Sequence, residues 1–264
     1  MATRIQELFE RLRADRKPAL IAYVTAGDPT PGATAGIVAA LERGGADLIE
    51  LGVPFSDPIA DGPVIQRGAD RALKAGTTLP RVLEIASQIR KSSQIPILLF
   101  SYLNPMLRYG FTRLAADAKA AGVDGVLMTD ASVEEAEEYV AAMRAAGLDT
   151  VFLVAPTSTE RRLALVAKYS SGFVYLVSRT GVTGEQASLS DSIQPLIDAT
   201  RKHTALPLAV GFGISNHAQF ESVGSMAEGV VVGSAIVRVL EKYGASADLE
   251  TQVEAFTRSL KYGT

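Results

Sequence analysis

The sequence predicts an α/β protein built as a (β/α)8 barrel, and two observations support that prediction. Eight short segments rich in β-branched and aromatic residues recur along the 264 residues. Each is almost continuously apolar, which is typical of a parallel strand buried on both faces. Segments with helical periodicity separate them. Strand–helix alternation repeated eight times favours a closed barrel, with an open doubly wound sheet as the structural alternative.

The expected strands occupy residues 19–27, 47–54, 96–102, 125–130, 149–156, 172–178, 207–213 and 229–234. Expected helices between them include 31–44, 78–92, 110–121, 132–146, 159–169 and 191–203. Residues 3–14 predict an extra amphipathic N-terminal helix that covers the bottom of the barrel. Residues 246–262 predict the eighth helix or an additional one. No stretch has the composition of a linker, so we expect a single TIM-barrel domain over residues 1–264.

Composition excludes several classes of protein. The formal net charge is −3 and the basic residues are scattered, so nucleic acid is not an expected partner. The chain has no cysteine, which rules out disulfides and thiolate metal sites. His203 and His217 are the only histidines, too few for a zinc site with three nitrogen or sulfur ligands, so we expect no metal and assign both to the surface or to helix caps. Neither a signal peptide nor an apolar run of membrane-spanning length is present, so we expect a cytoplasmic protein that does not enter a membrane.

The repeat is uneven in two places, after the second and after the sixth expected strand. The long connections are residues 53–80 and 178–192. Both follow the carboxyl ends of strands, and in a barrel of this kind that rim carries the chemistry. Simple surface insertions are the alternative interpretation.

Carboxylates near this rim are candidates for acid–base chemistry. Glu50 lies in an otherwise apolar strand and faces either the barrel interior or the helix layer, where burial would raise its pKa. The alternative is a structural glutamate paired with a buried cation. Asp57 and Asp61 lie in FSDPIAD, where prolines and a glycine prevent a regular helix, so both belong to a shaped loop. They can instead anchor that loop through Asx turns, and magnesium held by the two is a weaker alternative.

Three glycine-containing turns follow the last three expected strands, at residues 181–184, 211–215 and 232–236. Glycine allows the backbone to approach an anion closely, and helix N-termini at this rim bind phosphate in many barrels. Ser215 and Ser234 can also cap the helices that follow and donate their hydroxyls. Ordinary turn chemistry is the alternative. Because no expected strand contains a lysine, a Schiff-base aldolase is disfavoured, which leaves cleavage by side-chain acids and bases.

Several motifs together resemble one known family. LIELGVPFSDPIADGPVIQ (48–66) is similar to the signature segment of the tryptophan synthase α subunit family. VTAGDP (24–29), YLVSRTGVTG (175–184), GFGIS (211–215) and GSAIV (233–237) resemble further segments of that family. The resemblance covers nearly the whole chain. It departs at MTDASVEE (128–135), where the family usually has V-P-D-L-P-x-E-E, on the side expected to meet a β subunit.

The resemblance implies roles for individual residues. Glu50 matches the acid/base that moves the proton at indole C3, and Asp61 matches the carboxylate that meets the indole N–H. Tyr175 matches a tyrosine near the reacting glycerol, and Thr183 lies in a loop that closes over the substrate and contacts Asp61. The matching phosphate-binding residues are Gly184, Gly213, Gly233 and Ser234. The matching indole pocket comprises Tyr23, Tyr102, Leu127 and Phe212.

The resemblance also implies an activity: retro-aldol cleavage of indole-3-glycerol phosphate to indole and glyceraldehyde 3-phosphate in L-tryptophan biosynthesis. It implies no cofactor on this chain, with pyridoxal phosphate (PLP) only on a partner β subunit in an αββα tetramer. Three alternatives stay open at this point. They are a stand-alone lyase that releases free indole, a catalytically silent activator of the β subunit, and another isomerase or aldolase of phosphorylated sugars on the same fold.

Overall fold

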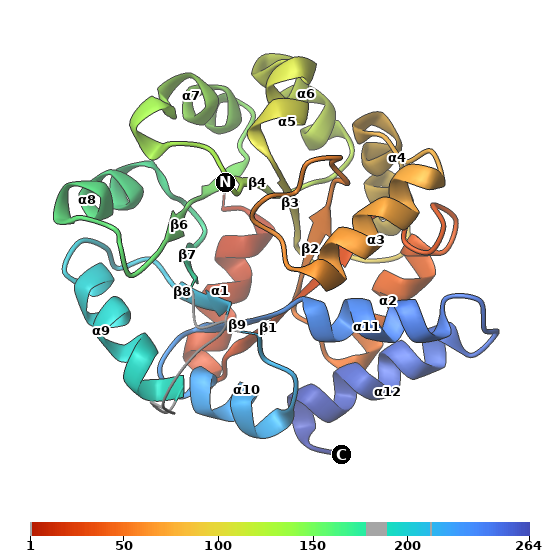
Figure 1. Cartoon of the computed structure of the whole chain (residues 1–264). Helices are drawn as coiled ribbons and strands as arrows, with labels where there is room; N and C mark the ends of the chain where they lie inside the picture. Colours follow the sequence, from red (N-terminus) through yellow and green to blue (C-terminus); the bar gives the residue numbers. More distant parts are fainter. Residues whose placement is uncertain (1, 178–188, 212) are drawn as a thin grey trace.

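The computed structural model describes residues 2–177, 189–211 and 213–264. Within them, parallel strands are hydrogen-bonded in the order β5-β4-β3-β2-β1-β9-β8-β7-β6. Their bounds are β1 Ala19–Thr25, β2 Leu48–Gly52, β3 Ile97–Ser101, β4 Gly125–Met128, β5 Asp149–Val151, β6 Leu153–Val154, β7 Val174–Val177, β8 Leu208–Gly211 and β9 Gly229–Val232. Because β5 and β6 are separated by one residue, the sheet closes on itself, and the predicted (β/α)8 barrel is confirmed (Figure 1).

The fifth expected strand, 149–156, is interrupted at Phe152. Its first half pairs with β4 over Asp149–Val151, and its second half pairs with β7 over Leu153–Val154. Strands in a closed barrel are staggered, so one strand can finish pairing on one side before it begins on the other. The interruption therefore follows from the stagger of the barrel.

Helices surround the strands in a ring (Figure 1). Their bounds are α1 Arg4–Asp15, α2 Thr34–Gly44, α3 Pro63–Lys74, α4 Leu79–Arg90, α5 Leu103–Tyr109, α6 Phe111–Ala120, the 3-10 helix η1 Val133–Glu135, α7 Glu137–Ala145, α8 Glu160–Tyr169, α9 Leu189–Arg201, α10 His217–Gly224, α11 Ser234–Tyr243 and α12 Leu249–Tyr262. The expected helix 132–146 is split into η1 and α7, and a short α5 follows β3 directly. None of the helices in the described ranges is long and apolar enough to cross a membrane.

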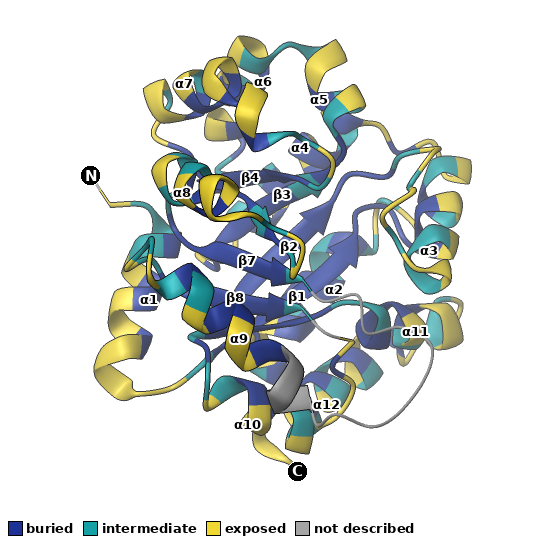
Figure 2. Cartoon of the chain, turned by 60° about the vertical axis from the view of Figure 1, so that its left-hand side comes forward, coloured by how far each residue is buried: buried dark blue, intermediate teal, exposed yellow. Residues whose placement is uncertain are grey.

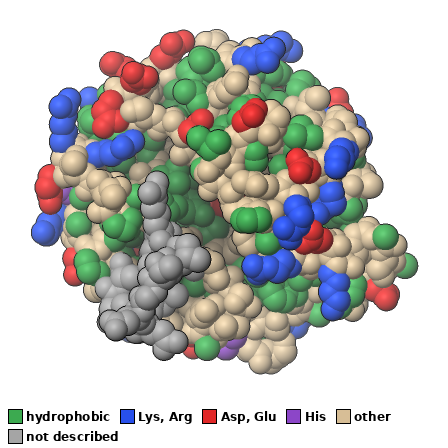
Figure 3. Space-filling view, in the orientation of Figure 1, with side chains coloured by type: hydrophobic (Ala, Val, Ile, Leu, Met, Phe, Trp, Pro, Cys, Tyr) green, Lys and Arg blue, Asp and Glu red, His purple; other side chains and the backbone are tan. Residues whose placement is uncertain are grey.

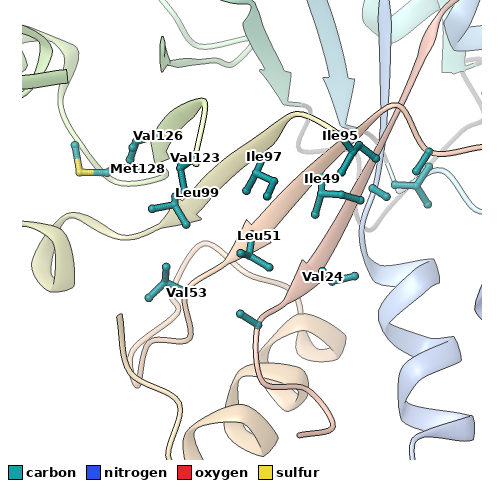
Figure 4. Packing of buried hydrophobic residues seen from close by; sticks show 14 of the residues in the cluster. Val24, Ile49, Leu51, Val53, Ile95, Ile97, Leu99, Val123, Val126 and Met128 are labelled. Carbon is teal, nitrogen blue, oxygen red and sulfur yellow. The ribbon is translucent and has the colours of Figure 1, made fainter. Parts of the chain in front are cut away.

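The strands are buried on both faces, as Figure 2 shows by colour. Alternate residues of each strand point to opposite sides. In β1, Leu20 and Val24 join the outer core between the strands and the helices, whereas Ile21 joins a separate inner core. Figure 4 shows the outer packing, with Ile49 and Leu51 beside their neighbours from β1 and β3.

Helix α1 closes the N-terminal end of the barrel, as predicted. Ile5, Leu8 and Phe9 pack against the inner core, with the rings of Phe9 and Phe173 5.6 Å apart. The helix begins with a capping box formed by Thr3 and Gln6, which satisfies backbone N–H groups that a helix start leaves unpaired. Because this end is sealed, access to the barrel interior is from the carboxyl ends of the strands.

Candidate active site

A cavity of about 150 Å³ lies inside the carboxyl-terminal rim of the barrel. Figure 3 shows the hollow near the centre of this face, with hydrophobic side chains inside it. The structure brings together six of the predicted site residues. The residues that line the cavity include Tyr23, Glu50, Tyr175, Gly213, Gly233 and Ser234. They come from β1, β2, β7 and the turns after β8 and β9, which lie far apart in sequence.

Glu50 faces the barrel interior, which resolves the ambiguity that the sequence leaves. It is 1% exposed and lies between Tyr23 of β1 and Leu98 of β3 in the strand register. Its Oε1 has no hydrogen-bond partner among the described residues. Burial raises the pKa of the carboxyl to about 8. Glu50 is therefore mostly protonated at neutral pH. Its pKa lies close to the value that suits a general acid or base.

Tyr23 and Tyr175 flank this carboxyl from β1 and β7. A Cβ at Gly52 would lie 2.4 Å from the Tyr23 hydroxyl, and one at Gly211 would lie 2.6 Å from the Tyr175 hydroxyl. Glycine at these two positions therefore makes room for the tyrosine rings. Burial raises the pKa of both tyrosines, and the carboxylates of Glu50 and Asp61 raise it further. Both hydroxyls stay protonated and can donate hydrogen bonds into the cavity.

Asp61 lies at the end of the loop between β2 and α3. Its backbone N–H donates to Pro58 O at 3.0 Å, and Gln66 Nε2 donates to Asp61 O at 2.9 Å, which fixes the loop against the start of α3. Burial raises the pKa of the Asp61 carboxyl to about 6, and a hydrogen bond from Tyr102 opposes this rise. Asp61 is thus mainly ionised at pH 7, in the state that attracts a positively charged N–H.

Tyr102 supports this loop from the end of β3. Its hydroxyl accepts the Ala60 N–H at 3.0 Å and is near enough to the Asp61 carboxyl to lower the pKa of that carboxyl, and its ring lies 5.3 Å from that of Phe55. Tyr102 is not among the residues that line the cavity. Its predicted contact with indole stays a prediction, whereas its hold on the loop is observed.

Asp57 lies on the exposed part of the same loop and accepts a hydrogen bond from Ser56 Oγ at 2.6 Å. Among the described residues, no group of three or more His, Cys, Asp or Glu side chains is arranged to hold a metal ion.

The opposite side of the cavity is formed by the turns after β8 and β9. Gly213 has a φ of +68°, a conformation that favours glycine, and Gly233 immediately precedes α11. Helix α11 begins at Ser234, so its first backbone N–H groups point to this side of the cavity and suit an anion. Polar donors on this side and carboxylates on the other give the cavity two chemically different ends.

The expected capping by two serines is wrong. The N-cap of α10 is Asn216, whose side chain accepts the Gln219 N–H at 3.0 Å, while the Ser215 N–H donates to Gln219 Oε1 at 2.8 Å. Ser234 is the first residue of α11 rather than its cap, and the cap position is occupied by Gly233. An asparagine one residue later caps α10 better because its carbonyl reaches the N3 amide.

Some predicted residues are elsewhere. Leu127 is fully buried in the inner core of the barrel and is not part of the cavity lining. Thr183, Gly184 and Phe212 lie outside the described residues, as does the turn at 181–184. Their predicted roles stay predictions.

The cavity also contains residues that the sequence analysis did not single out as site residues. They are Ile65, Phe100, Gly211 and Val231. Phe100 and Val231 each lie two positions after another interior position of the same strand, Leu98 and Gly229. The two-residue period of a strand points to them only once one interior position is known, and the sequence does not show which face is interior.

Comparison with known proteins assigns the family. A sequence profile described as "Tryptophan synthase alpha chain" matches residues 9–264. This chain belongs to the tryptophan synthase alpha chain family. Among relatives of the same description, that of Solibacter usitatus is 68% identical over 99% of this chain and 98% of its own. That of Geotalea uraniireducens is 48% identical over 99% and 97%.

Solved structures of tryptophan synthase alpha subunits share the fold. The tryptophan synthase subunit alpha of Legionella pneumophila superimposes with a TM-score of 0.92, at 35% identity, over 99% of this chain and 98% of that one. A chain of a ligand-free tryptophan synthase from M. tuberculosis gives a TM-score of 0.89 at 35% identity, covering 99% of both chains. The resemblance noted in the sequence is therefore confirmed over the entire barrel.

Proposed function

We propose that this chain is the lyase subunit of tryptophan synthase and cleaves indole-3-glycerol phosphate to indole and glyceraldehyde 3-phosphate. The observation that carries the proposal is the Glu50 carboxyl, which is buried, has an Oε1 without a hydrogen-bond partner among the described residues, and lines a cavity bordered by the turns after β8 and β9. Asp61 is not part of the lining, but its carboxylate is near enough to raise the pKa of Tyr23 and Tyr175, which are part of it. The substrate has a matching order of groups: an indole N–H at one end, a phosphate at the other and the reacting carbons between.

The cleavage needs a proton to move twice. In the first step the Glu50 carboxyl donates its proton to indole C3, which creates a cationic indolenine, and the Asp61 carboxylate stabilises its N–H. In the second step the Glu50 carboxylate takes the proton of the neighbouring glycerol hydroxyl. The oxygen forms the aldehyde, the carbon–carbon bond breaks, and its electron pair restores the aromatic indole. Glu50 regains its proton, so no external acid is consumed.

The phosphate does not react, but its binding can position the reacting atoms. We assign it to the backbone N–H groups at Gly213, Gly233 and Ser234, together with Gly184, which lies outside the described residues. Thr183, also outside them, is proposed to contact Asp61 when the substrate is bound. The cavity of about 150 Å³ is smaller than the roughly 300 Å³ at the lower end of ligand pockets. Ile65, which lines the cavity and is only partly buried, is the side chain that we propose moves when the substrate binds.

The indole ring is assigned to the apolar side of the cavity. Tyr23 and Phe100 form an edge-to-face pair there, with ring centroids 5.2 Å apart. We propose that Tyr102, Leu127 and Phe212 complete this pocket and that Tyr175 donates a hydrogen bond to the glycerol.

The reaction consists of proton transfers and one bond cleavage, so we propose no cofactor on this chain. We further propose that it docks on a PLP-dependent β subunit in an αββα tetramer in the cytoplasm. Apolar side chains exposed at the same rim support a partner there: Ile59 on the loop of Asp61 is 86% exposed, and Leu107 on α5 is 55% exposed.

The test is indole release from indole-3-glycerol phosphate by the purified chain, with and without a tryptophan synthase β subunit. Slow release that the β subunit accelerates supports the proposed subunit. Fast release that the β subunit does not change indicates a stand-alone lyase. Release in neither condition, together with faster turnover by the β subunit, indicates a silent activator.

A further inference from the structure

A network of four charged side chains joins three elements beside the cavity. Arg71 on α3 makes a two-fold ion pair with Asp28 after β1, with Nε–Oδ1 and Nη2–Oδ2 distances of 2.7 and 2.9 Å. Its Nη1 also reaches Glu241 Oε1 on α11 at 3.2 Å. Arg67, one turn earlier on α3, bonds the same Glu241 at 2.6 and 2.9 Å.

The three elements are also in close packing contact. A Cβ at Gly68 of α3 would lie 3.0 Å from Asp28 Oδ2, 3.2 Å from Val237 of α11 and 3.3 Å from Thr25 of β1. Glycine therefore lets α3 approach both neighbours so closely that Arg71 can span them. Asp28 is fully buried beneath it, and the side chain of Arg71 is 29% exposed.

Each joined element contributes to the cavity. Asp61 precedes the first residue of α3 by two positions, and Ile65 in the first turns of α3 is part of the cavity lining. Ser234, the first residue of α11, also lines the cavity, and a Cβ at the adjacent Gly233 would lie 3.6 Å from Ile65 Cδ1. The ion pairs thus connect the helix that follows the indole-binding carboxylate to the helix that begins at the phosphate end.

Stability alone is a poor explanation for this arrangement. Taking a carboxylate fully out of water opposes folding, and buried ion pairs often stabilise a protein no better than well-packed apolar side chains. A guanidinium has a rigid, planar set of donors, so one arginine can fix the relative orientation of two acidic partners. That property determines geometry more than it determines stability.

We propose that Arg71 is a positioning residue that sets the separation between Asp61 and the N-terminus of α11, and so matches the cavity to the length of the substrate. The inference rests on the proposed function. It requires that the two halves of the substrate bind normally when Arg71 is changed, while the intact molecule, which must reach both ends at once, binds and reacts poorly.

The test compares Arg71→Met and Arg71→Lys with the unchanged chain. Calorimetry measures binding of indole, of glyceraldehyde 3-phosphate and of indole-3-glycerol phosphate, and indole release gives kcat and KM. Arg43→Met is the matched control, because Arg43 on α2 bonds Glu254 on α12 at 2.7 Å, away from the cavity.

For Arg71→Met we expect kcat/KM to fall about 10- to 100-fold, since a misplacement of about 1 Å is enough for such a loss. The fall should be shared between a higher KM and a lower kcat. The dissociation constants of the two fragments should change less than about threefold. Arg71→Lys keeps one charge without the planar donors, so it should recover only part of the loss, and Arg43→Met should react normally.

Equal weakening of both fragments and of the substrate by Arg71→Met would show a merely structural role and overturn the inference, as would normal kcat/KM. If Arg71→Met fails to fold, Glu241→Ala decides, because it removes the α11 contact and leaves the Asp28 pair intact. It should lower kcat/KM severalfold with unchanged fragment binding, and unchanged kinetics would refute the inference.

If the unchanged chain binds the substrate without cleaving it, the proposed function fails, and the binding comparison still decides the role of Arg71. If the unchanged chain does not bind the substrate, both fail.

Discussion

Replacing Glu50 with glutamine should have opposite effects on activity and on stability. Glutamine has nearly the same shape as glutamic acid but neither donates nor accepts the catalytic proton. We therefore expect Glu50→Gln to lower the rate of indole release at least about 100-fold, as is typical when a general acid–base group is removed. The same substitution removes a buried group whose ionisation opposes folding.

The size of the stability effect follows from the pKa. Burial raises the pKa of Glu50 from its ordinary value of 4.5 to about 8. Between these values the unfolded chain is ionised while the folded chain keeps its proton. The free energy of unfolding is therefore not reduced by Glu50 below pH 4.5, and it decreases as the pH rises from 4.5 to 8. One pKa unit corresponds to about 1.4 kcal/mol, so the loss reaches about 3 kcal/mol at pH 7 and about 5 kcal/mol above pH 8.

Glutamine does not ionise, so the variant escapes this loss. Relative to the unchanged chain, the gain of Glu50→Gln in the free energy of unfolding should therefore grow with pH, from about 1 kcal/mol at pH 5 to about 3 kcal/mol at pH 7 and about 4 kcal/mol at pH 8. Urea unfolding followed by circular dichroism at several pH values measures this difference, and Glu138→Gln, which removes an exposed carboxylate on α7, is the control. A difference in the free energy of unfolding that does not vary with pH would show that the pKa of Glu50 is not raised by burial. Near-normal cleavage by the variant would refute its role as acid and base.

Three further predictions concern the same site. The reaction needs Glu50 protonated and Asp61 ionised, and their pKa values are about 8 and about 6. A plot of kcat/KM against pH should therefore be bell-shaped, with a maximum near pH 7. A flat profile from pH 5 to 9 would contradict both assignments. Tyr102→Phe removes the hydroxyl that lowers the pKa of Asp61. The acidic limb of this pH profile should therefore move to higher pH, and kcat/KM should fall about tenfold. An unmoved limb would show that the hydroxyl does not act on Asp61. Leu127→Ala should lower the free energy of unfolding by about 2–5 kcal/mol in urea titrations, because this side chain is fully buried in the inner core, and a loss below about 1 kcal/mol would contradict that placement.

The sequence predicted the barrel well because its strands are buried on both faces and its helices separate them regularly. The same double burial hid which residues face the interior. In the strand around Glu50 both faces are apolar, so the alternation that normally marks one face is absent. Only the closed barrel places Glu50 and Tyr23 in register on the inside and Leu51 on the outside.

The loops explain most of the remaining differences. The spacing of Asp57 and Asp61 predicted a shaped loop but not which carboxylate it turns inward. That choice depends on Tyr102, which arrives from β3 and holds Ala60 and Asp61 in place. Arg71 lies within the long connection 53–80, which the sequence assigned to the functional rim without singling out Arg71, and its partners are 43 and 170 residues away. Contacts between residues so distant in sequence leave no local pattern.

The two ends of the barrel use charged groups differently. At the closed end, Asp149 accepts hydrogen bonds from Thr3 and Gln6, and Asp124 pairs with Arg4 and Arg90. At the open end, Glu50 is buried without a partner among the described residues, and its ionisation lowers stability at neutral pH. A carboxyl that were paired would be more stable, but it would have a lower pKa and would not hold a proton to donate. Burial without a paired cation among the described residues is therefore what suits the group to proton transfer, and the well-satisfied closed end supplies stability that the open end lacks.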